Sequence, residues 1–214
     1  MDVYYQPSHE VGGDFYDFQA LGGNKYGILI ADVVGHGLGA SIIASLSKFA
    51  FFQNYKHWAN PSFLLSAMNN DLVKKSFGRF TTATYICIDR EKQKFVISNA
   101  GHPSFLHWKS KEAKLVEIKP KGKPLGILPE LVFFEEEYVF ESGDRFLFYT
   151  DGLTEEENAK GEEFGIQNLM DCFFTGIQKN PRDPISYLIS KFHEFTEMVG
   201  HPHDDVTLIH VEIL

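Results

Sequence analysis

The stretch over residues 26–41 constrains the fold more than any other part of the sequence. Its apolar residues 28–31 predict a buried strand that ends on the carboxylate of Asp32. A turn with three glycines follows, and a helix is expected to begin after it. A buried carboxylate is costly without a positive partner, and no lysine or arginine lies between Lys25 and Lys48. We therefore expect a metal ion beside Asp32.

The glycines of this turn allow two interpretations. Their freedom to take positive φ lets the backbone approach a ligand and frees carbonyl oxygens to coordinate a cation. The alternative is that Asp32 caps the following helix and that the glycines only form a tight turn. The stretch by itself does not separate the two, so the decision rests on the rest of the chain.

The charge and hydropathy of the chain exclude some classes of partner. Its 214 residues carry a net charge of −9, which disfavours nonspecific nucleic-acid binding and suits a protein that holds cations. No apolar run approaches the roughly 18 residues that span a membrane, so no membrane partner is expected for this segment. The length predicts one domain over residues 1–214.

The cysteines and the N-terminus give two further expectations. Cys87 and Cys172 are too few for a disulfide framework or a zinc spacing, so we expect core thiols in the reducing cytoplasm. Acidic Asp2 stands where a signal peptide would be basic. A strand pattern begins already at Val3, which predicts a domain cut from a longer multidomain regulator.

The periodicity of the remaining chain predicts hairpins alternating with helices. Asn60 is expected to cap one helix and Asp183 another, each followed by a proline. The last helix should bury apolar residues as far as Val199. Strands are predicted at 81–89, 94–99, 104–108, 114–118, 132–140, 145–150 and 206–213. Helices are predicted at 39–55, from 61 to an end at Gly78, at 164–180 and after 183.

Carboxylates recur where a strand ends or turns. Asp14 follows two glycines, Asp32 and Asp151 end buried strands, and Asp204 or Asp205 precedes the last strand. Oxygen ligands of this kind suit Mg²⁺ or Mn²⁺ rather than zinc. Two such ions about 4 Å apart can clamp a phosphoryl group and activate a bridging water. For Asp14 taken alone, a β-turn with solvated acids is the alternative.

Seven stretches along the chain carry glycine, aspartate and asparagine in a recognisable order. They are residues 11–18, 32–37, 99–103, 124–127, 149–155, 161–165 and 204–207. Together they resemble the SpoIIE/RsbU-type branch of the PPM (PP2C-like) metal-dependent protein phosphatases. This resemblance implies an α+β fold, a PP2C-like four-layer αββα sandwich of two antiparallel sheets flanked by helices. It also implies that a metal-activated water hydrolyses phosphoserine or phosphothreonine on a protein.

The resemblance assigns roles to particular residues. It makes Asp32 the carboxylate that bridges two Mn²⁺ or Mg²⁺ ions and the Val33 carbonyl a ligand to one of them. Asp151 and Asp204 are further ligands, and Asp14 is the acid near the first metal, acting directly or through water. Asp14, Asp32 and Asp151 are thus the expected catalytic residues.

Other residues are expected to support this site. Asp17 should brace the loop of Asp14 by hydrogen bonds, Gly35 should shape the turn, and Asp205 is the second acid of the closing pair. His36 is a candidate general acid. It lies four residues after Asp32, whereas the corresponding histidine of the eukaryotic branch lies two residues after its bridging aspartate. A turn histidine bonded to backbone is the alternative.

The eukaryotic branch also has an arginine ahead of its first acidic motif. Here His9 is the only basic side chain before Lys25, so we expect metal and water to hold the phosphate. His102 is expected to be structural, and His201 and His203 are expected to be solvated loop residues. Because no arginine is expected to hold the phosphate, turnover is expected to be slow without a partner.

The partners implied by the resemblance are proteins. The expected substrate is a phosphorylated STAS-domain anti-anti-sigma factor in bacterial partner switching. Sensor or receiver domains are expected upstream in the full-length protein, and a homodimer is left open.

Two rival functions are weighed against the phosphatase. A catalytically weak or inactive PPM-fold protein-binding module would have lost acidic ligands, whereas all the expected acids are present here. A diguanylate cyclase is suggested by residues 12–15, but its signature has an acid where Phe15 stands. A cyclase would also leave Asp32, Asp151 and Asp204 unexplained.

Overall fold

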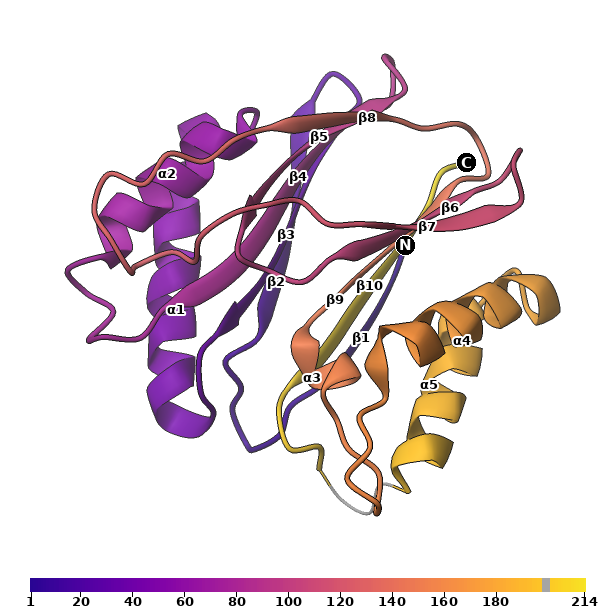
Figure 1. Cartoon of the computed structure of the whole chain (residues 1–214). Coiled ribbons are helices and arrows are strands. Elements are labelled where there is room, and N and C mark those ends of the chain that lie inside the picture. The colour runs from indigo at the N-terminus through magenta and orange to yellow at the C-terminus, as the bar shows by residue number, and fades with distance from the viewer. Residues whose placement is uncertain (198–200) are drawn as a thin grey trace. The chain divides into compact units, whose positions relative to one another are not determined.

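The computed structural model describes residues 1–197 and 201–214, which divide between two units that each contain one antiparallel sheet (Figure 1). Unit 1 comprises Met1–Glu10, Pro103–Ile118 and Ser142–Leu214. Unit 2 comprises Val11–His102 and Lys119–Glu141. Each unit is described by itself below.

Unit 2 has a five-stranded sheet in the order β2-β3-β4-β5-β8, with every neighbouring pair antiparallel. Helices α1 and α2 lie on one face of this sheet (Figure 1). A short 3₁₀ turn, Tyr55–His57, joins the two helices. The elements are β2 (Phe15–Gly22), β3 (Lys25–Val33), α1 (Gly37–Gln53), α2 (Pro61–Leu72), β4 (Thr81–Asp89), β5 (Lys94–Ala100) and β8 (Glu136–Val139).

The core of unit 2 forms where alternate residues of the central strands meet the helices. Leu29, Ala31 and Val33 are fully buried and belong to one cluster with apolar residues of α1 and α2. The ring of Phe51 stacks on Trp58 at 5.2 Å between centroids. This packing fixes β3, and with it the position of the turn that follows.

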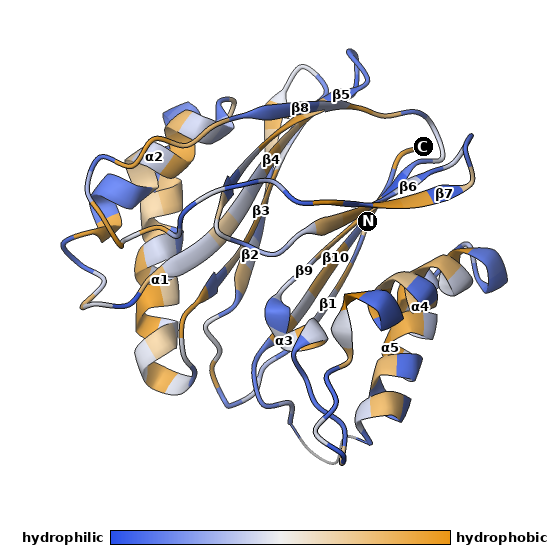
Figure 2. Ribbon diagram, in the orientation of Figure 1, coloured by the Kyte–Doolittle hydropathy of each residue, from blue (hydrophilic) through white to orange (hydrophobic). Residues whose placement is uncertain are grey.

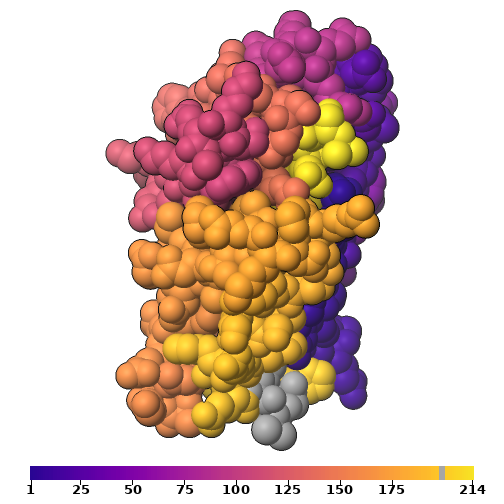
Figure 3. Space-filling model, turned by 90° about the vertical axis from the view of Figure 1, so that its right-hand side faces the viewer, coloured from indigo at the N-terminus to yellow at the C-terminus, as the bar shows by residue number. Residues whose placement is uncertain are grey.

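Unit 1 has a five-stranded antiparallel sheet in the order β1-β10-β9-β6-β7. Figure 2 shows the apolar stripes of α4 and α5, and Figure 3 shows the two helices side by side. Their buried residues join those of the sheet in one cluster. The elements are β1 (Asp2–Gln6), β6 (Phe105–Lys109), β7 (Lys114–Ile118), β9 (Arg145–Tyr149), α3 (Asp151–Thr154), α4 (Gly165–Lys179), α5 (Pro184–Thr196) and β10 (Val206–Glu212).

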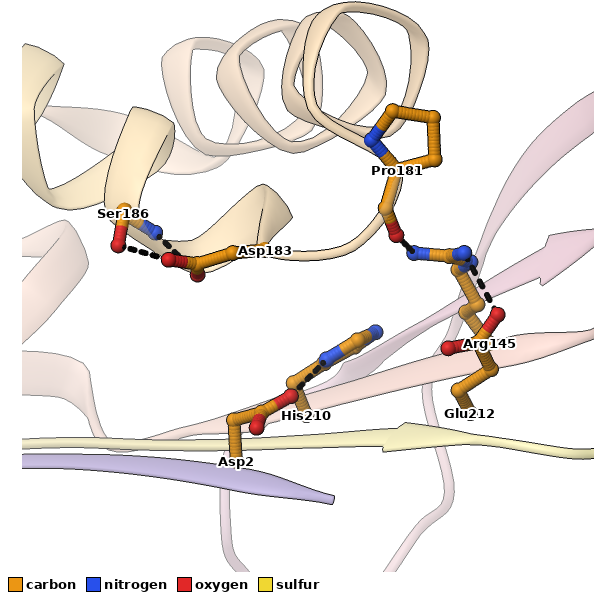
Figure 4. Close-up of polar contacts among 7 residues, drawn as sticks. All are labelled: Asp2, Arg145, Pro181, Asp183, Ser186, His210 and Glu212. Atoms are coloured by element: carbon orange, nitrogen blue, oxygen red, sulfur yellow. Dashed lines mark hydrogen bonds and ion pairs between the residues drawn. The ribbon is translucent and has the colours of Figure 1, made fainter.

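Polar contacts hold the α4–α5 connection to the sheet of unit 1 (Figure 4). Arg145 donates to the Pro181 carbonyl and to the Glu212 carboxylate, both at 2.6 Å. Asp183 accepts from the Ser186 backbone N–H at 3.1 Å, so the predicted N-cap of α5 is confirmed. Arg145 therefore anchors the connection to the sheet, and Asp183 caps the start of α5.

Most of the predicted elements are present, and the α+β class with two antiparallel sheets and flanking helices is confirmed. The strand expected over 132–140 is shorter, because Leu131 and Phe133 turn into the core and only Glu136–Val139 pairs with β5. Asn60 makes no side-chain cap, although Pro61 begins α2. Helix α2 ends at Leu72 and continues as turns, so the predicted helix end at Gly78 is wrong. Val199 lies outside the described residues.

Candidate metal and substrate site

Asp14 and Asp32 lie at the same end of the β2–β3 pair. Phe15 is the register partner of Ala31, so the residues just outside that pair, Asp14 and Asp32, stand opposite each other. Asp14 is buried and Asp32 is half-buried. The register of one hairpin therefore brings two of the predicted ligands together within unit 2.

The Gly12–Gly13 bend packs tightly on the strand end that carries Val33. A β-carbon at Gly13 would lie 2.9 Å from the carbonyl oxygen of Val33 and 3.2 Å from the β-carbon of Ala40. Only glycine fits this close approach. The predicted carbonyl ligand is thus held between the Gly13 backbone and the start of α1.

Arg79 lies on the turn after Asp32, and the sequence analysis missed it. Its guanidinium donates to the Val34 carbonyl at 2.8 Å. A β-carbon at Gly35 would lie 2.5 Å from its Nη1 atom, and one at Gly39 would lie 2.9 Å from Nη2. No lysine or arginine lies between Lys25 and Lys48 in the sequence, but tertiary packing brings Arg79 to this turn from 44 to 45 positions away along the chain.

Asp17, Gly35 and His36 are the residues predicted to support the site. Asp17 accepts from the Gln19 side chain and forms an ion pair with Lys48 of α1 at 3.2 Å, so these contacts tie β2 to the helix rather than brace the loop of Asp14. His36 is exposed and occupies the N-cap position of α1, where its side chain makes no capping bond. Gly35 has a φ of +89°, which favours glycine.

A buried polar network holds the strand beside Asp32. Thr82 is the register partner of Asp32, and its hydroxyl lies 2.9 Å from Nδ1 of His102. Asn99 joins the network by donating to the Thr84 hydroxyl at 2.9 Å and to the His102 carbonyl at 3.0 Å. His102 is buried in this network, so the predicted structural role fits its contacts.

Asp151 and Asp204 belong to a second carboxylate group, in unit 1. A β-carbon at Gly152 would overlap the Asp205 carbonyl oxygen and lie 3.3 Å from the carbonyl carbon of Asp204. The Asp151–Gly152 turn therefore presses directly on the backbone of the closing acidic pair. As at Gly13 in unit 2, the absence of a side chain at Gly152 lets two aspartate-bearing segments approach closely.

Burial and repulsion between neighbouring carboxylates raise pKa values in this group. Burial raises the pKa of Asp151, against the lowering effect of its own backbone N–H and that of Gly152. Burial and the nearby negative charges of Asp151, Glu163 and Asp204 raise the pKa of Glu155. A cation placed among these carboxylates would relieve both effects.

Asp204 and Asp205 differ in what their side chains hold. The Asp205 carboxylate accepts from the Ser8 backbone N–H at 2.7 Å and from the Ser8 hydroxyl at 3.0 Å, so it anchors the N-terminal segment. Asp204 accepts from the Asp205 backbone N–H at 2.8 Å and is half-buried. This difference favours Asp204 over Asp205 as the ligand.

The loop histidines have partners within unit 1. Nδ1 of His203 lies 3.0 Å from the buried Glu156 carboxylate, and Nδ1 of His201 lies 3.1 Å from the Pro7 carbonyl. The expectation of solvated loop residues holds for their exposure but not for their contacts.

The structure thus brings the predicted ligands together in two pairs, one in each unit. Over residues 1–197 and 201–214, no group of three or more His, Cys, Asp or Glu side chains is arranged to hold a metal ion. The donors of each pair are carboxylate and carbonyl oxygens beside glycine, and such donors suit Mg²⁺ or Mn²⁺. The residues present therefore fit the expected ions.

Comparison with known proteins identifies the family. The family described as Stage II sporulation protein E (SpoIIE) matches residues 22–214. The chain belongs to the SpoIIE family. Phosphoserine phosphatase RsbP of Bacillus subtilis is 25% identical over 222 residues, covering 100% of this SpoIIE-family chain and 52% of RsbP. Phosphoserine phosphatase RsbU of the same organism is 27% identical over 206 residues, with 95% and 60% covered.

A solved structure supports the SpoIIE-family fold. The SiaA-PP2C domain of Pseudomonas aeruginosa superposes with a TM-score of 0.86 at 18% identity, covering 100% of this chain and 85% of that one. The PP2C-like fold is thereby confirmed. The chain spans about half the length of the curated relatives that it matches.

Within the described residues, no helix is long and apolar enough to cross a membrane.

Proposed function

We propose that this chain is a metal-dependent protein serine/threonine phosphatase domain that hydrolyses phosphoserine or phosphothreonine on a regulatory protein. The observation that carries the proposal is the pairing of its acids, Asp14 with Asp32 and Asp151 with Asp204, at strand ends of a SpoIIE-family fold. The names of RsbP and RsbU support the choice of phosphoserine as substrate.

The residues proposed to hold the metal ions are Asp14, Asp32, the Val33 carbonyl, Asp151 and Asp204. When bound, Mn²⁺ or Mg²⁺, proposed at two per site, would activate a water for attack on phosphorus and offset the charge of the phosphoryl group.

The chain's own contribution is to prepare this arrangement. Gly13 and Gly152 let backbone segments approach closely, so that each acid is fixed beside its neighbour. Arg79 holds the Val34 carbonyl and so fixes the turn that carries Val33. Carboxylates fixed before metal and substrate arrive need no further ordering during the reaction.

The test is release of phosphate from a phosphoserine protein and from an aryl phosphate, with and without Mn²⁺. Wild-type turnover should require Mn²⁺, and Asp32→Asn should lower it at least about a hundredfold because an essential ligand is weakened. Asp171→Asn, which changes an exposed acid of α4, is the matched control and should keep wild-type activity.

Turnover that survives chelation or the Asp32→Asn change would contradict the metal mechanism. The alternative function is a catalytically weak or inactive PPM-fold binding module. Calorimetry separates it, because a module without metal would show no Mn²⁺ binding that Asp32→Asn abolishes.

The biological setting is part of the same proposal. We infer that sensor or receiver domains lie upstream in the full-length protein and that a STAS-domain phosphoprotein is the substrate; this chain covers only 52% of RsbP and 60% of RsbU, so both relatives contain further segments. A homodimer is also compatible with this setting. Cys87 and Cys172 are both free thiols, which agrees with a cytoplasmic location.

A further inference from the structure

A groove in unit 2 lies between two segments that follow β7 and precede β8. Its volume is about 410 Å³, and its walls are residues 121–123 and 130–134. Lys121 and Lys123 stand on one wall, and Glu130, Val132 and Phe134 on the other. None of these residues has a role in the proposed catalytic site.

Both walls of the groove contact the body of unit 2. A β-carbon at Gly122 would overlap the Asn99 carbonyl oxygen, so the lysine-bearing wall rests directly on the end of β5. Leu125 exchanges two backbone hydrogen bonds with Thr81, at 3.0 and 2.8 Å. Phe133 is buried in the core and holds the other wall. Both walls are therefore held by contacts within unit 2.

The two walls combine positive charge with exposed apolar surface. Among the described residues, neither Lys121 nor Lys123 has an ion-pair partner, and Glu130 is the one acid that lines the groove. Val132 is 73% exposed and Phe134 is 74% exposed. In a chain with a net charge of −9, this local surface suits an acidic peptide that also carries an apolar side chain.

The groove lies at the end of the sheet that carries Asp32. Asp32 pairs with Thr82, and Thr84, two residues further along β4, pairs with Asn99. With strands about 4.8 Å apart and about 3.4 Å per residue, Asn99 is about 12 Å from Asp32. An extended peptide covers this distance in about four residues.

We infer that this groove binds the substrate polypeptide itself, through acidic and apolar residues about four positions from the phosphorylated side chain. The inference rests on the proposed phosphatase function and specifies its substrate class. Lys121 and Lys123 pair with the acidic residues, and Val132 and Phe134 contact the apolar one. The groove thus selects phosphoproteins by the residues that flank the phosphate.

The test uses fluorescent phosphoserine peptides with two glutamates and a leucine three to five residues from the phosphoserine, on either side. A second set has lysines in place of the glutamates. Anisotropy measured without metal reports binding alone, so this result stands apart from any failure of catalysis. Wild type should bind the glutamate peptide about three- to tenfold more tightly than the lysine peptide at low salt, and less so at high salt.

The decisive variant is Lys121→Glu/Lys123→Glu, which should reverse this preference. A reversal cannot come from misfolding, because a misfolded protein would lose both peptides. Arg90→Glu/Lys92→Glu makes the same charge change in the turn at the opposite end of β4 and β5, and should keep the wild-type preference. Equal binding of both peptides by wild type, or the same result from both variants, would overturn the inference.

Kinetics then separate the groove from the chemistry. With Mn²⁺, the Lys121→Glu/Lys123→Glu variant should raise KM for the glutamate peptide and leave turnover of a small aryl phosphate unchanged. An equal loss on both substrates would overturn docking at the groove. Absence of aryl phosphate turnover in wild type would contradict the proposed function instead.

Discussion

At the residue scale, Arg79 provides the turn after Asp32 with a hydrogen-bond donor from a distant part of the sequence. Its bond to the Val34 carbonyl, at 2.8 Å, holds the peptide next to the proposed Val33 ligand. The guanidinium fits because Gly35 and Gly39 have no side chains. Lysine cannot replace it, since a single ammonium lacks the planar fork that spans both glycines.

Arg79→Ala should therefore weaken the turn. We expect the free energy of unfolding to fall by about 1 kcal/mol, the usual effect of losing one such hydrogen bond, as measured by urea denaturation. Calorimetry should show weaker Mn²⁺ binding for Arg79→Ala and for Arg79→Lys. The control is Arg90→Ala, which removes an exposed arginine from the β4–β5 turn. If both alanine variants behaved alike, Arg79 would have no role in the turn.

At the scale of an element, the edge strand β1 contacts a buried histidine of β10, His210. This buried side chain of β10 lies 3.0 Å from the Asp2 carboxylate of β1, and its Nε2 atom has no hydrogen-bond partner in the described structure (Figure 4). Burial lowers the pKa of His210, while Asp2 and Glu212 oppose this and Arg145 adds to it.

Acid should accordingly destabilise the protein through His210. Its pKa is lower in the folded chain than in the unfolded one, so the unfolded chain takes up the proton first as pH falls below about 6.5. The free energy of unfolding should decrease from pH 7.5 to 5.5, and His210→Asn should show a smaller decrease. The measurement is urea denaturation across this range. An unchanged slope in the variant, with exposed His201→Asn as control, would contradict the prediction.

At the scale of the whole molecule, each unit supplies one pair of acids to the proposed ligand set. A metal that binds only the folded chain stabilises it by mass action, by about 2.7 kcal/mol at a hundred times its Kd. We expect Mn²⁺ to raise the Tm of wild type by several degrees. If metal binding needs both pairs of acids, Mn²⁺ should not raise the Tm of Asp32→Asn or of Asp151→Asn.

Scanning calorimetry with and without Mn²⁺ checks this expectation. Asp171→Asn, an exposed acid of α4, should keep the wild-type shift and so controls for loss of charge alone. A full Mn²⁺ shift in Asp151→Asn would show that Asp32 and Asp14 bind the ion without the second pair.

The sequence by itself determined the elements and the places of the acids. Hydropathy alternation marks the strands, and glycine beside aspartate marks the strand ends at Asp32 and Asp151, because both signals depend only on neighbouring residues. The same local reasoning predicted the Asp183 cap correctly. It also predicted a strand over 132–140, whereas β8 covers only Glu136–Val139.

Only the tertiary structure decided which distant groups meet. Arg79 reaches Gly35, and Gly122 rests on Asn99, through packing and strand register that link segments far apart in sequence. No local pattern encodes such contacts, because they depend on how whole strands and helices settle against each other to bury the core. The acids of the site could therefore be predicted from the sequence. The position of Arg79 beside the turn, and the groove at residues 121–123 and 130–134, required the tertiary structure.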